Sequence, residues 1–340
     1  ERCTFLNETD CLRCAMCEGS SFTSVQEDGF LVQLYDYLMG KIPQLHRFCI
    51  NCDQIHLPGL AQPAWPSVCQ RELCQWSLTE MGIGRISTDD LMLYAEVVDL
   101  LLAITRAAAA SPRSNQILSP FPLVFVEKEQ KQEKGLDPKK PDYIKMKEVA
   151  EKLPSMQQIA ASENENQLLE ICNQGGDMIY GLLQWILTSC PARILSLPRG
   201  HRLKSMGTPY QFLVQSASPE REEIFAKAKS IHGSTFAFHG SPIENWHRIL
   251  REGIKNVSGT PLQLNGAAYG PGVYLSPNAS TSLGYSKVQG GTSVPSQSGD
   301  LSKNIFVSDK QVHIMALCEI IENGIKRNGT VWVVSNDEHI

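Results

Sequence analysis

Hydrophobic and polar positions predict helices in the first two thirds of the chain and mainly strands in the last third. Helical periodicity of about 3.6 residues covers four segments, 30–39, 88–110, 143–190 and 220–229. Residues 210–216 are an apolar, β-prone run and predict a strand. The long apolar stretch near 91–105 contains two carboxylates, so we interpret it as a buried helix and not as a membrane span. This pattern favours an α+β fold.

Two polar segments interrupt this pattern. The charged run 127–134 is followed by glycine and a proline–lysine run, and we interpret it as a solvated loop. A Gly- and Ser-rich stretch near 289–303 predicts a flexible insertion. We therefore expect three regions: a cysteine-rich segment at 1–80, a mainly helical region at 81–204 with a charged loop at 127–142, and a third domain at 205–340.

The stretch from Phe236 to Gly253, FAFHGSPIENWHRILREG, joins a short apolar strand to an amphipathic helix. Ser241 and Glu244 have the spacing of a capping box, which predicts a helix starting directly after Ser241 and ending at Gly253. His239 and Gly240 then lie at the strand-to-helix junction, where backbone N–H groups suit a polar or anionic ligand. On this pattern alone, an ordinary turn histidine is the alternative.

Composition and charge narrow the function classes. The chain has 340 residues and a formal net charge of −5, so no global basic field indicates nucleic acid as a partner. Membrane and signal-peptide patterns are also absent from the sequence given, although it opens on glutamate. Eight of the eleven cysteines lie within the first 74 residues. This clustering favours metal ligation in a reducing compartment over disulfides, and we expect a cytoplasmic or nuclear location.

Two close cysteine pairs predict a structural zinc site. The ligands would be Cys49, Cys52, Cys69 and Cys74, because four thiolates on two short knuckles can complete a tetrahedral shell. His46 or His56 could replace one cysteine, and the alternative is buried free cysteines. A second metal set is also open, formed by Cys3, Cys11, Cys14 and Cys17. No pattern typical of a catalytic zinc is present.

A second stretch with candidate binding residues lies at 267–286 and reads AAYGPGVYLSPNASTSLGYS. Gly270 and Gly272 allow a tight turn before a short strand, on which Tyr274 faces away from its apolar neighbours. Ser282 and Tyr285 are three residues apart and share one face of a predicted helix. Core packing is the alternative for each tyrosine.

Three motifs together, HGS at 239–241, GPGVYLS at 270–276 and SLGY at 282–285, resemble the catalytic domain of the poly(ADP-ribose) polymerase family. These enzymes are ADP-ribosyltransferases similar to diphtheria toxin. The resemblance covers about 205–340, and the upstream cysteines resemble, more loosely, a branch that transfers single ADP-ribose units. It implies two mostly antiparallel sheets packed face to face around an NAD+ cleft, with protein acceptors that include the enzyme itself.

The resemblance also implies roles for individual residues. His239 would hydrogen-bond the adenosine ribose, and the Gly240 backbone would hold the nicotinamide carboxamide together with Ser282. Tyr285 and Tyr274 would enclose the nicotinamide ring between them, with His239 and Tyr274 as members of the catalytic triad. Ser241 would line the pocket as the helix cap.

The third triad residue is not assigned. Glu338 follows a polar turn and lacks the strand context that the family has. We expect the sequence to stop before the third triad residue. Transfer of single ADP-ribose units is therefore preferred only because the upstream cysteines resemble the branch that does so. Two alternatives remain: a catalytically inactive protein with the same NAD+ pocket, and a zinc-dependent protein-interaction module. A serine hydrolase and a Rossmann dehydrogenase are disfavoured, because G-x-S-x-G and G-x-G-x-x-G motifs are missing.

Overall fold

A computed structural model describes nine stretches of the chain. They are 29–55, 68–69, 71–81, 86–128, 131–190, 192–215, 219–265, 268–286 and 312–340. The chain divides into two compact units, residues 1–45 and 46–340, and each is described by itself. The second cysteine set at residues 3–17, His56 and the Gly- and Ser-rich stretch at 289–303 lie outside the described residues.

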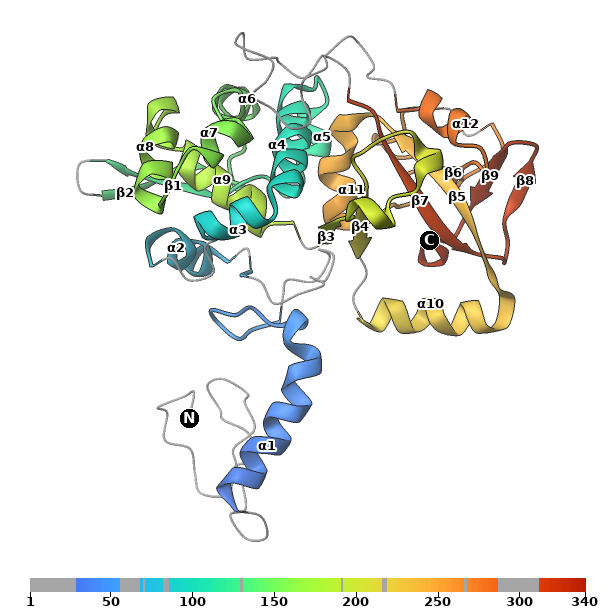
Figure 1. The fold of residues 1–340 in the computed structure, drawn as a ribbon, viewed down its shortest axis with the longest axis horizontal. Coiled ribbons are helices and arrows are strands. Elements are labelled where there is room, and N and C mark those ends of the chain that lie inside the picture. The colour runs from blue at the N-terminus through green and yellow to red at the C-terminus, as the bar shows by residue number, and fades with distance from the viewer. Residues whose placement is uncertain are drawn as a thin grey trace. The chain divides into compact units, whose positions relative to one another are not determined.

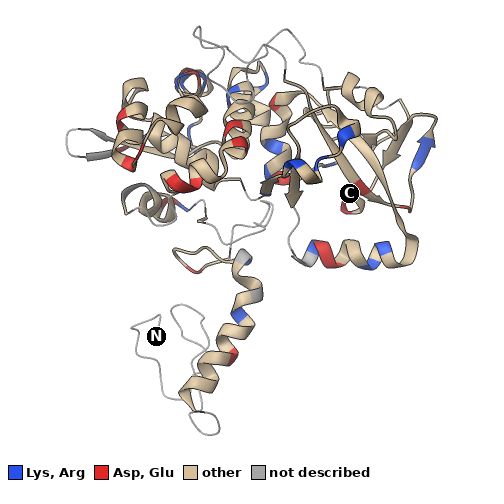
Figure 2. Ribbon diagram, viewed as in Figure 1, with Lys and Arg blue, Asp and Glu red and all other residues tan. Residues whose placement is uncertain are grey.

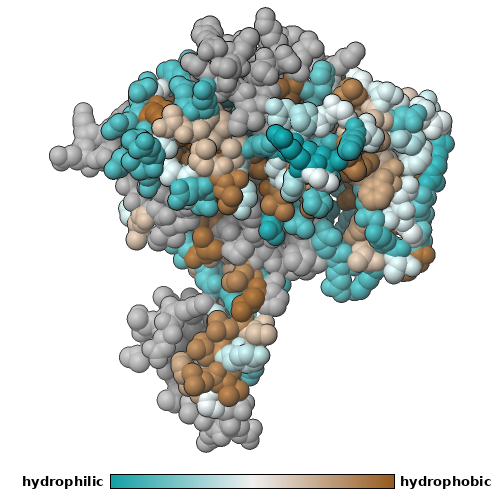
Figure 3. Space-filling model, in the orientation of Figure 1, coloured by the Kyte–Doolittle hydropathy of each residue, from teal (hydrophilic) through white to brown (hydrophobic). Residues whose placement is uncertain are grey.

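The described part of the first unit contains helix α1 (Phe30–Lys41), which agrees with the helical pattern predicted at 30–39. None of its residues is buried, although most are apolar. Phe30 and Leu31 are 76% and 75% exposed, and Figure 3 shows hydrophobic side chains gathered on this helix.

The second unit begins with a helical region (Figure 1). Its helices are α2 (Glu72–Glu80), α3 (Thr88–Leu93), α4 (Ala95–Ala110), α5 (Ser114–Ile117), α6 (Tyr143–Glu151), α7 (Met156–Ala160), α8 (Glu165–Gly175) and α9 (Ile179–Thr188). The helix predicted at 88–110 is interrupted at Tyr94, where α3 ends and α4 begins. A capping box between Ser87 and Asp90 starts α3.

Helix α4 forms the centre of this region. Twelve of its residues are buried, from Val97 to Ala109, which confirms that the long apolar stretch is a core helix. Within the described residues, no helix combines the length and the apolarity that a membrane crossing needs.

The charged run is not a loop, and this prediction was wrong. Strands β1 (Val124–Lys128) and β2 (Lys131–Leu136) form an antiparallel hairpin across it. Val124, Val126 and Leu136 are buried against the helices, and this burial holds a hairpin whose sequence is otherwise charged. Among the described residues of this stretch, 137–142 lies outside the strands, and α6 starts after it with Asp142 as its cap.

The last third contains short antiparallel sheets, and the predicted mixture of helices and strands is confirmed. Its elements are β3 (Arg193–Ser196), β4 (Phe212–Gln215), α10 (Pro219–His232), β5 (Ser234–Ser241), α11 (Trp246–Glu252), β6 (Val273–Leu275), α12 (Ala279–Gly284), β7 (Ile314–Ile321), β8 (Lys326–Asn328) and β9 (Val331–Val334). Strand β3 pairs with β4 and β5 with β7, while β9 lies between β6 and β8. An isolated bridge between Phe238 and Ser276 joins β5 to the end of β6.

The helical region and the last third share one hydrophobic core. The cluster that contains the buried residues of α4 and α9 also contains Ile243, which lies just before α11, and Trp246 and Leu250 within α11. A smaller core lies between the sheets and includes Ala237 and Val273. Charged residues of both signs are interspersed over the described elements (Figure 2).

Candidate active site

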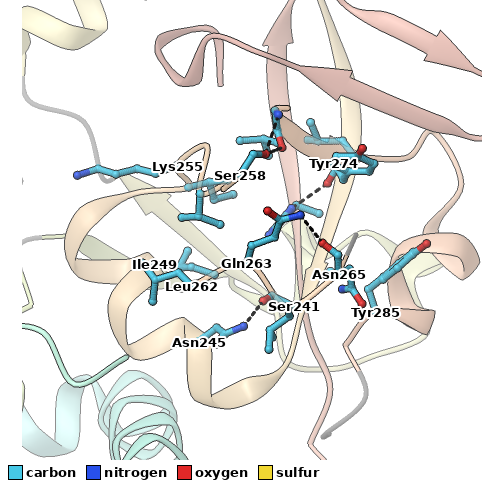
Figure 4. A pocket seen from close by; sticks show the side chains of 18 of the residues that line it. Ser241, Asn245, Ile249, Lys255, Ser258, Leu262, Gln263, Asn265, Tyr274 and Tyr285 are labelled. Carbon is cyan, nitrogen blue, oxygen red and sulfur yellow. Dashed lines mark hydrogen bonds between the residues drawn. The ribbon is translucent and has the colours of Figure 1, made fainter. Parts of the chain in front are cut away.

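The three motifs, which are far apart in the sequence, meet at one cavity of about 290 Å³ (Figure 4). All six residues predicted to bind NAD+ line it: His239, Gly240, Ser241, Tyr274, Ser282 and Tyr285. The first three end strand β5, Tyr274 is the middle residue of β6, and the last two belong to α12 and its C-terminal end.

His239 is held by the neighbouring strand. Its Nδ1 lies 3.0 Å from the carbonyl oxygen of Tyr274, and because a carbonyl only accepts, Nδ1 must carry the proton. Burial lowers the pKa of His239, and the bond to Tyr274 opposes this only in part. The imidazole is therefore neutral near pH 7, and Nε2 is left as an acceptor that suits a ligand hydroxyl group.

Gly240 is required by the packing of α12 on β5. A Cβ at this position would lie 1.8 Å from the backbone oxygen of Ser282, so helix α12 rests directly on the strand. The N–H and C=O of Phe238 both bond to Ser276, on the edge of β5 opposite β7. Backbone groups alternate along a strand, so those of Gly240 point to the same edge, where the cavity lies.

The SLGY motif contributes one buried and one open side chain. Ser282 is buried and donates its hydroxyl proton to the carbonyl oxygen of Phe238 at 2.7 Å. A ligand would therefore meet its lone pairs. Tyr285 is 50% exposed and lines the cavity, so one face of its ring is accessible for stacking.

Tyr274 holds the loop that precedes its own strand. Its hydroxyl group accepts from the Tyr269 N–H at 3.0 Å and donates to the Gly270 carbonyl at 2.9 Å. Gly272 has φ +152, and a Cβ there would lie 2.5 Å from a methyl carbon of Val333. The tight turn predicted before β6 is therefore confirmed, and glycine is needed for it.

The capping box predicted at Ser241 and Glu244 does not form, so this prediction was wrong. Ser241 is still part of β5, paired with Ile314 of β7, and a 3-10 turn at Ile243–Asn245 separates it from α11. Its hydroxyl accepts from the Asn245 side chain at 2.9 Å. Glu244 is buried where this turn packs on α4, and burial raises its pKa. The predicted helix end at Gly253 is confirmed by φ +83.

Sequence reasoning missed several residues of the cavity wall. Asn245 and Arg248 lie on a segment already predicted to be helical, so a search for polar residues on its cavity face would have found them. Leu262 lies in the loop between α11 and β6. Ile117 reaches the cavity from α5, more than 100 residues upstream, and no local pattern marks it.

One part of the cavity is charged. Arg248 donates to Glu252 at 2.7 Å, and Lys255 approaches the same carboxylate at 4.0 Å. Among the lining residues that the structure describes, Glu252 is the one carboxylate. Glu338, which was not assigned a role, is exposed in a short 3-10 turn and does not line the cavity.

Comparison with known proteins assigns these motifs to a family. Residues 210–320 match the family described as "Poly(ADP-ribose) polymerase catalytic domain". The chain carries a PARP catalytic domain. The match includes the three motifs, so the resemblance predicted from them is confirmed.

Curated relatives extend the likeness beyond the PARP domain. The chain is 36% identical to the protein mono-ADP-ribosyltransferase PARP8 of mouse and of human, over 95% of its own length. It spans 39% of the length of those relatives. It is also 25% identical over 62% of its length to the human protein mono-ADP-ribosyltransferase PARP16, of which it spans 59%.

Four cysteines ahead of the PARP domain form a compact cluster. The Sγ atoms of the two predicted pairs, Cys49 with Cys52 and Cys69 with Cys74, all lie within 4.8 Å of one another. A tight turn brings the first pair together, with Asp53 at φ +55 and its N–H bonded to the Cys49 carbonyl at 2.8 Å. This is the knuckle geometry that orients two thiols toward one point.

Donors around the cluster suit thiolates. Backbone N–H groups of Asn51 and Cys69 point at the Cys49 sulfur, at 3.4 and 3.2 Å. The pKa of Cys49 is lowered, chiefly by the hydrogen bond from the Cys69 thiol, and that bond raises the pKa of Cys69. Arg71 approaches the Cys69 sulfur at 3.3 Å and also donates to the Ile55 carbonyl at 2.7 Å. The cluster therefore fits a metal that prefers sulfur ligands.

Proposed function

We propose that this protein is an NAD+-dependent protein ADP-ribosyltransferase that transfers single ADP-ribose units to protein side chains, its own included, and releases nicotinamide. One observation carries the proposal: residues from β5, β6 and α12 surround a single cavity in a chain that has a PARP catalytic domain. The names of its relatives, which are mono-ADP-ribosyltransferases, support single-unit transfer.

The roles we propose follow from the contacts. His239, neutral and with Nε2 as an acceptor, would orient a ribose hydroxyl. The backbone of Gly240 would bind the carboxamide, and Ser282 would accept a hydrogen bond from it. Tyr285 and Tyr274 would hold the nicotinamide ring between them, which fixes the glycosidic bond for cleavage through an oxocarbenium-like state. The short antiparallel sheets would flank this cleft, as in the ADP-ribosyltransferase fold.

We also propose that the cysteine cluster binds one structural zinc ion through Cys49, Cys52, Cys69 and Cys74. The convergence of four sulfur atoms and the donors around them support this. Zinc would tie the segment before α2 to the fold, since such ions contribute much of the folding free energy of small segments. The predicted regions 1–80, 81–204 and 205–340, and a cytoplasmic or nuclear location, belong to the same proposal.

The experiment is an intact-mass measurement of the purified protein after incubation with NAD+, beside a His239→Ala variant. Added mass in single ADP-ribose units in the parent protein, and none in the variant, is expected. A ladder of many units would contradict mono-transfer.

A catalytically inactive NAD+-binding protein is the second candidate. One observation favours it: Glu252 is the one carboxylate among the described lining residues, and it forms an ion pair with Arg248. No added mass on the protein or on supplied acceptors, with NAD+ binding intact, would select this candidate.

A further inference from the structure

The cavity has two unlike sides. Figure 4 shows Tyr274 and Tyr285 on one side and Ile249, Leu262 and Asn245 on the other. The aromatic side suits the nicotinamide ring, so the second side is where the remainder of a dinucleotide would extend. This assignment of sides rests on the proposed function.

The second side is built partly by the helical region. Ile117 of α5 lines the cavity, although it precedes the PARP domain in the sequence. The backbone of the adjacent residue, Gln116, accepts a hydrogen bond from Arg248 at 3.2 Å. Helix α5 is therefore fastened to the wall of the cavity.

Arg113 is the centre of this attachment. Its guanidinium group donates to the Leu262 carbonyl at 3.1 Å and to the Asn245 side-chain oxygen at 3.5 Å. Its Nε donates to the Gln116 side chain at 3.3 Å, which orients the group. One side chain thus joins α5, the turn after β5, and the loop before β6.

Asn245 extends this connection into the first motif. It accepts from Arg113 through Oδ1 and donates through Nδ2 to the Ser241 hydroxyl at 2.9 Å. The buried carboxylate of Glu244 lies in the same turn, and its Oε2 makes no hydrogen bond within the described residues. Arg113 also acts electrostatically on Glu244, which supplies charge compensation in the turn.

We propose that Arg113 is a positioning residue of the dinucleotide site: it holds the Leu262 loop and the Asn245–Ser241 pair so that the second side of the cavity fits the adenosine half of NAD+. A planar guanidinium group with several donors can hold two acceptors at once, which lysine cannot do in the same geometry. Arg113 itself need not touch the ligand.

The test compares a whole ligand with a fragment, using the full 340-residue chain. Dissociation constants are measured by calorimetry for NAD+ and for nicotinamide, in the parent protein and in Arg113→Gln. We expect the NAD+ constant to rise about tenfold or more, as for loss of hydrogen bonds to a charged group, and the nicotinamide constant to stay within about twofold. Arg113→Lys should recover only part of the NAD+ affinity.

Arg202→Gln is the matched control. Arg202 is also a half-buried arginine with a backbone acceptor, the Leu197 carbonyl at 2.7 Å, but it pairs with Glu96 and does not line the cavity. Its NAD+ constant should stay within about twofold of the parent value. If Arg113→Gln does not fold, Gln116→Ala is measured instead. It should raise the dissociation constant of NAD+ by a smaller factor and leave that of nicotinamide unchanged.

The outcomes separate the two proposals. An unchanged NAD+ constant in Arg113→Gln, or equal losses for NAD+ and nicotinamide, would overturn the role of Arg113 while leaving the proposed function intact. A parent protein that binds nicotinamide and NAD+ equally weakly, or neither, would overturn both.

Discussion

Replacing Gly240 by alanine tests the close contact between β5 and α12. The new Cβ would lie 1.8 Å from the Ser282 carbonyl oxygen and 2.6 Å from its carbonyl carbon. Ordinary contact begins at 3.4 Å, so the strand and the helix must separate by about 1.6 Å. Because both obstacles are backbone atoms, no side chain can rotate away to relieve the clash.

The cost should be at the upper end of the range for overpacking, about 3 kcal/mol of the free energy of unfolding. For a unit of this size, a loss of that magnitude lowers Tm by roughly 5 °C. Moving α12 also moves Tyr285 relative to His239. A misplacement of about 1 Å can reduce turnover on the order of a hundredfold, so transfer activity should fall much more than stability.

Gly284→Ala is the control, because Gly284 is exposed on the same helix and a Cβ there meets nothing within 4 Å. It should leave Tm unchanged or raise it slightly, since alanine is favoured over glycine in a helix. Tm is measured by scanning fluorimetry, and single-turnover transfer by mass spectrometry. Equal Tm and equal transfer in Gly240→Ala and the parent protein would show that β5 and α12 do not make this close contact.

Three further predictions follow from the site and the core. Cys52→Ser should abolish the binding of one zinc per chain, measured by atomic emission after dialysis, while Cys318→Ser should retain it; equal zinc in both would exclude the cluster as the site. Burial and the charge of Arg251 hold the pKa of His247 well below its usual value, so the folded state binds fewer protons than the unfolded state. The free energy of unfolding should therefore be at its full value above pH 6.5 and fall by up to about 1.4 kcal/mol per pH unit below it. His247→Gln should reduce this pH dependence, measured by denaturation curves at several pH values. Equal pH dependence in the two proteins would show that His247 is not its source. Tyr285→Ala should weaken nicotinamide binding about fivefold, and Tyr285→Phe should restore it, because the ring face and not the hydroxyl is the contact proposed; equal affinities in all three proteins would contradict stacking.

Local patterns predicted most of the elements. Helix α4 was found from its long apolar stretch and helix α9 (Ile179–Thr188) from its helical pattern, and most residues of both helices are buried in the core. The strand at β4 and the helix at α10 were also found. The hairpin across the charged run was missed, since what holds it is the burial of Val124, Val126 and Leu136, which the charged pattern of the run does not indicate.

Contacts between distant residues explain what could not be predicted at the site. The local S-x-x-E pattern at Ser241 favoured a helix cap, but pairing with Ile314, 73 residues later, keeps Ser241 in a strand. The motif residues themselves were predicted to meet, and they do line one cavity. Arg113 and Ile117 lie in a segment with no motif, and their contribution depends on how α5 packs on the third region.

The core shared by α4, α9 and α11 has a consequence for how the chain can vary over evolution. A larger or smaller side chain on α4 changes the space left for Trp246 and Leu250, which lie 7 and 11 residues after His239 in the sequence. Substitutions in the two halves should therefore be correlated, with compensating changes in volume accepted together. A helical half taken from another lineage would be tolerated only with the α11 face that evolved beside it.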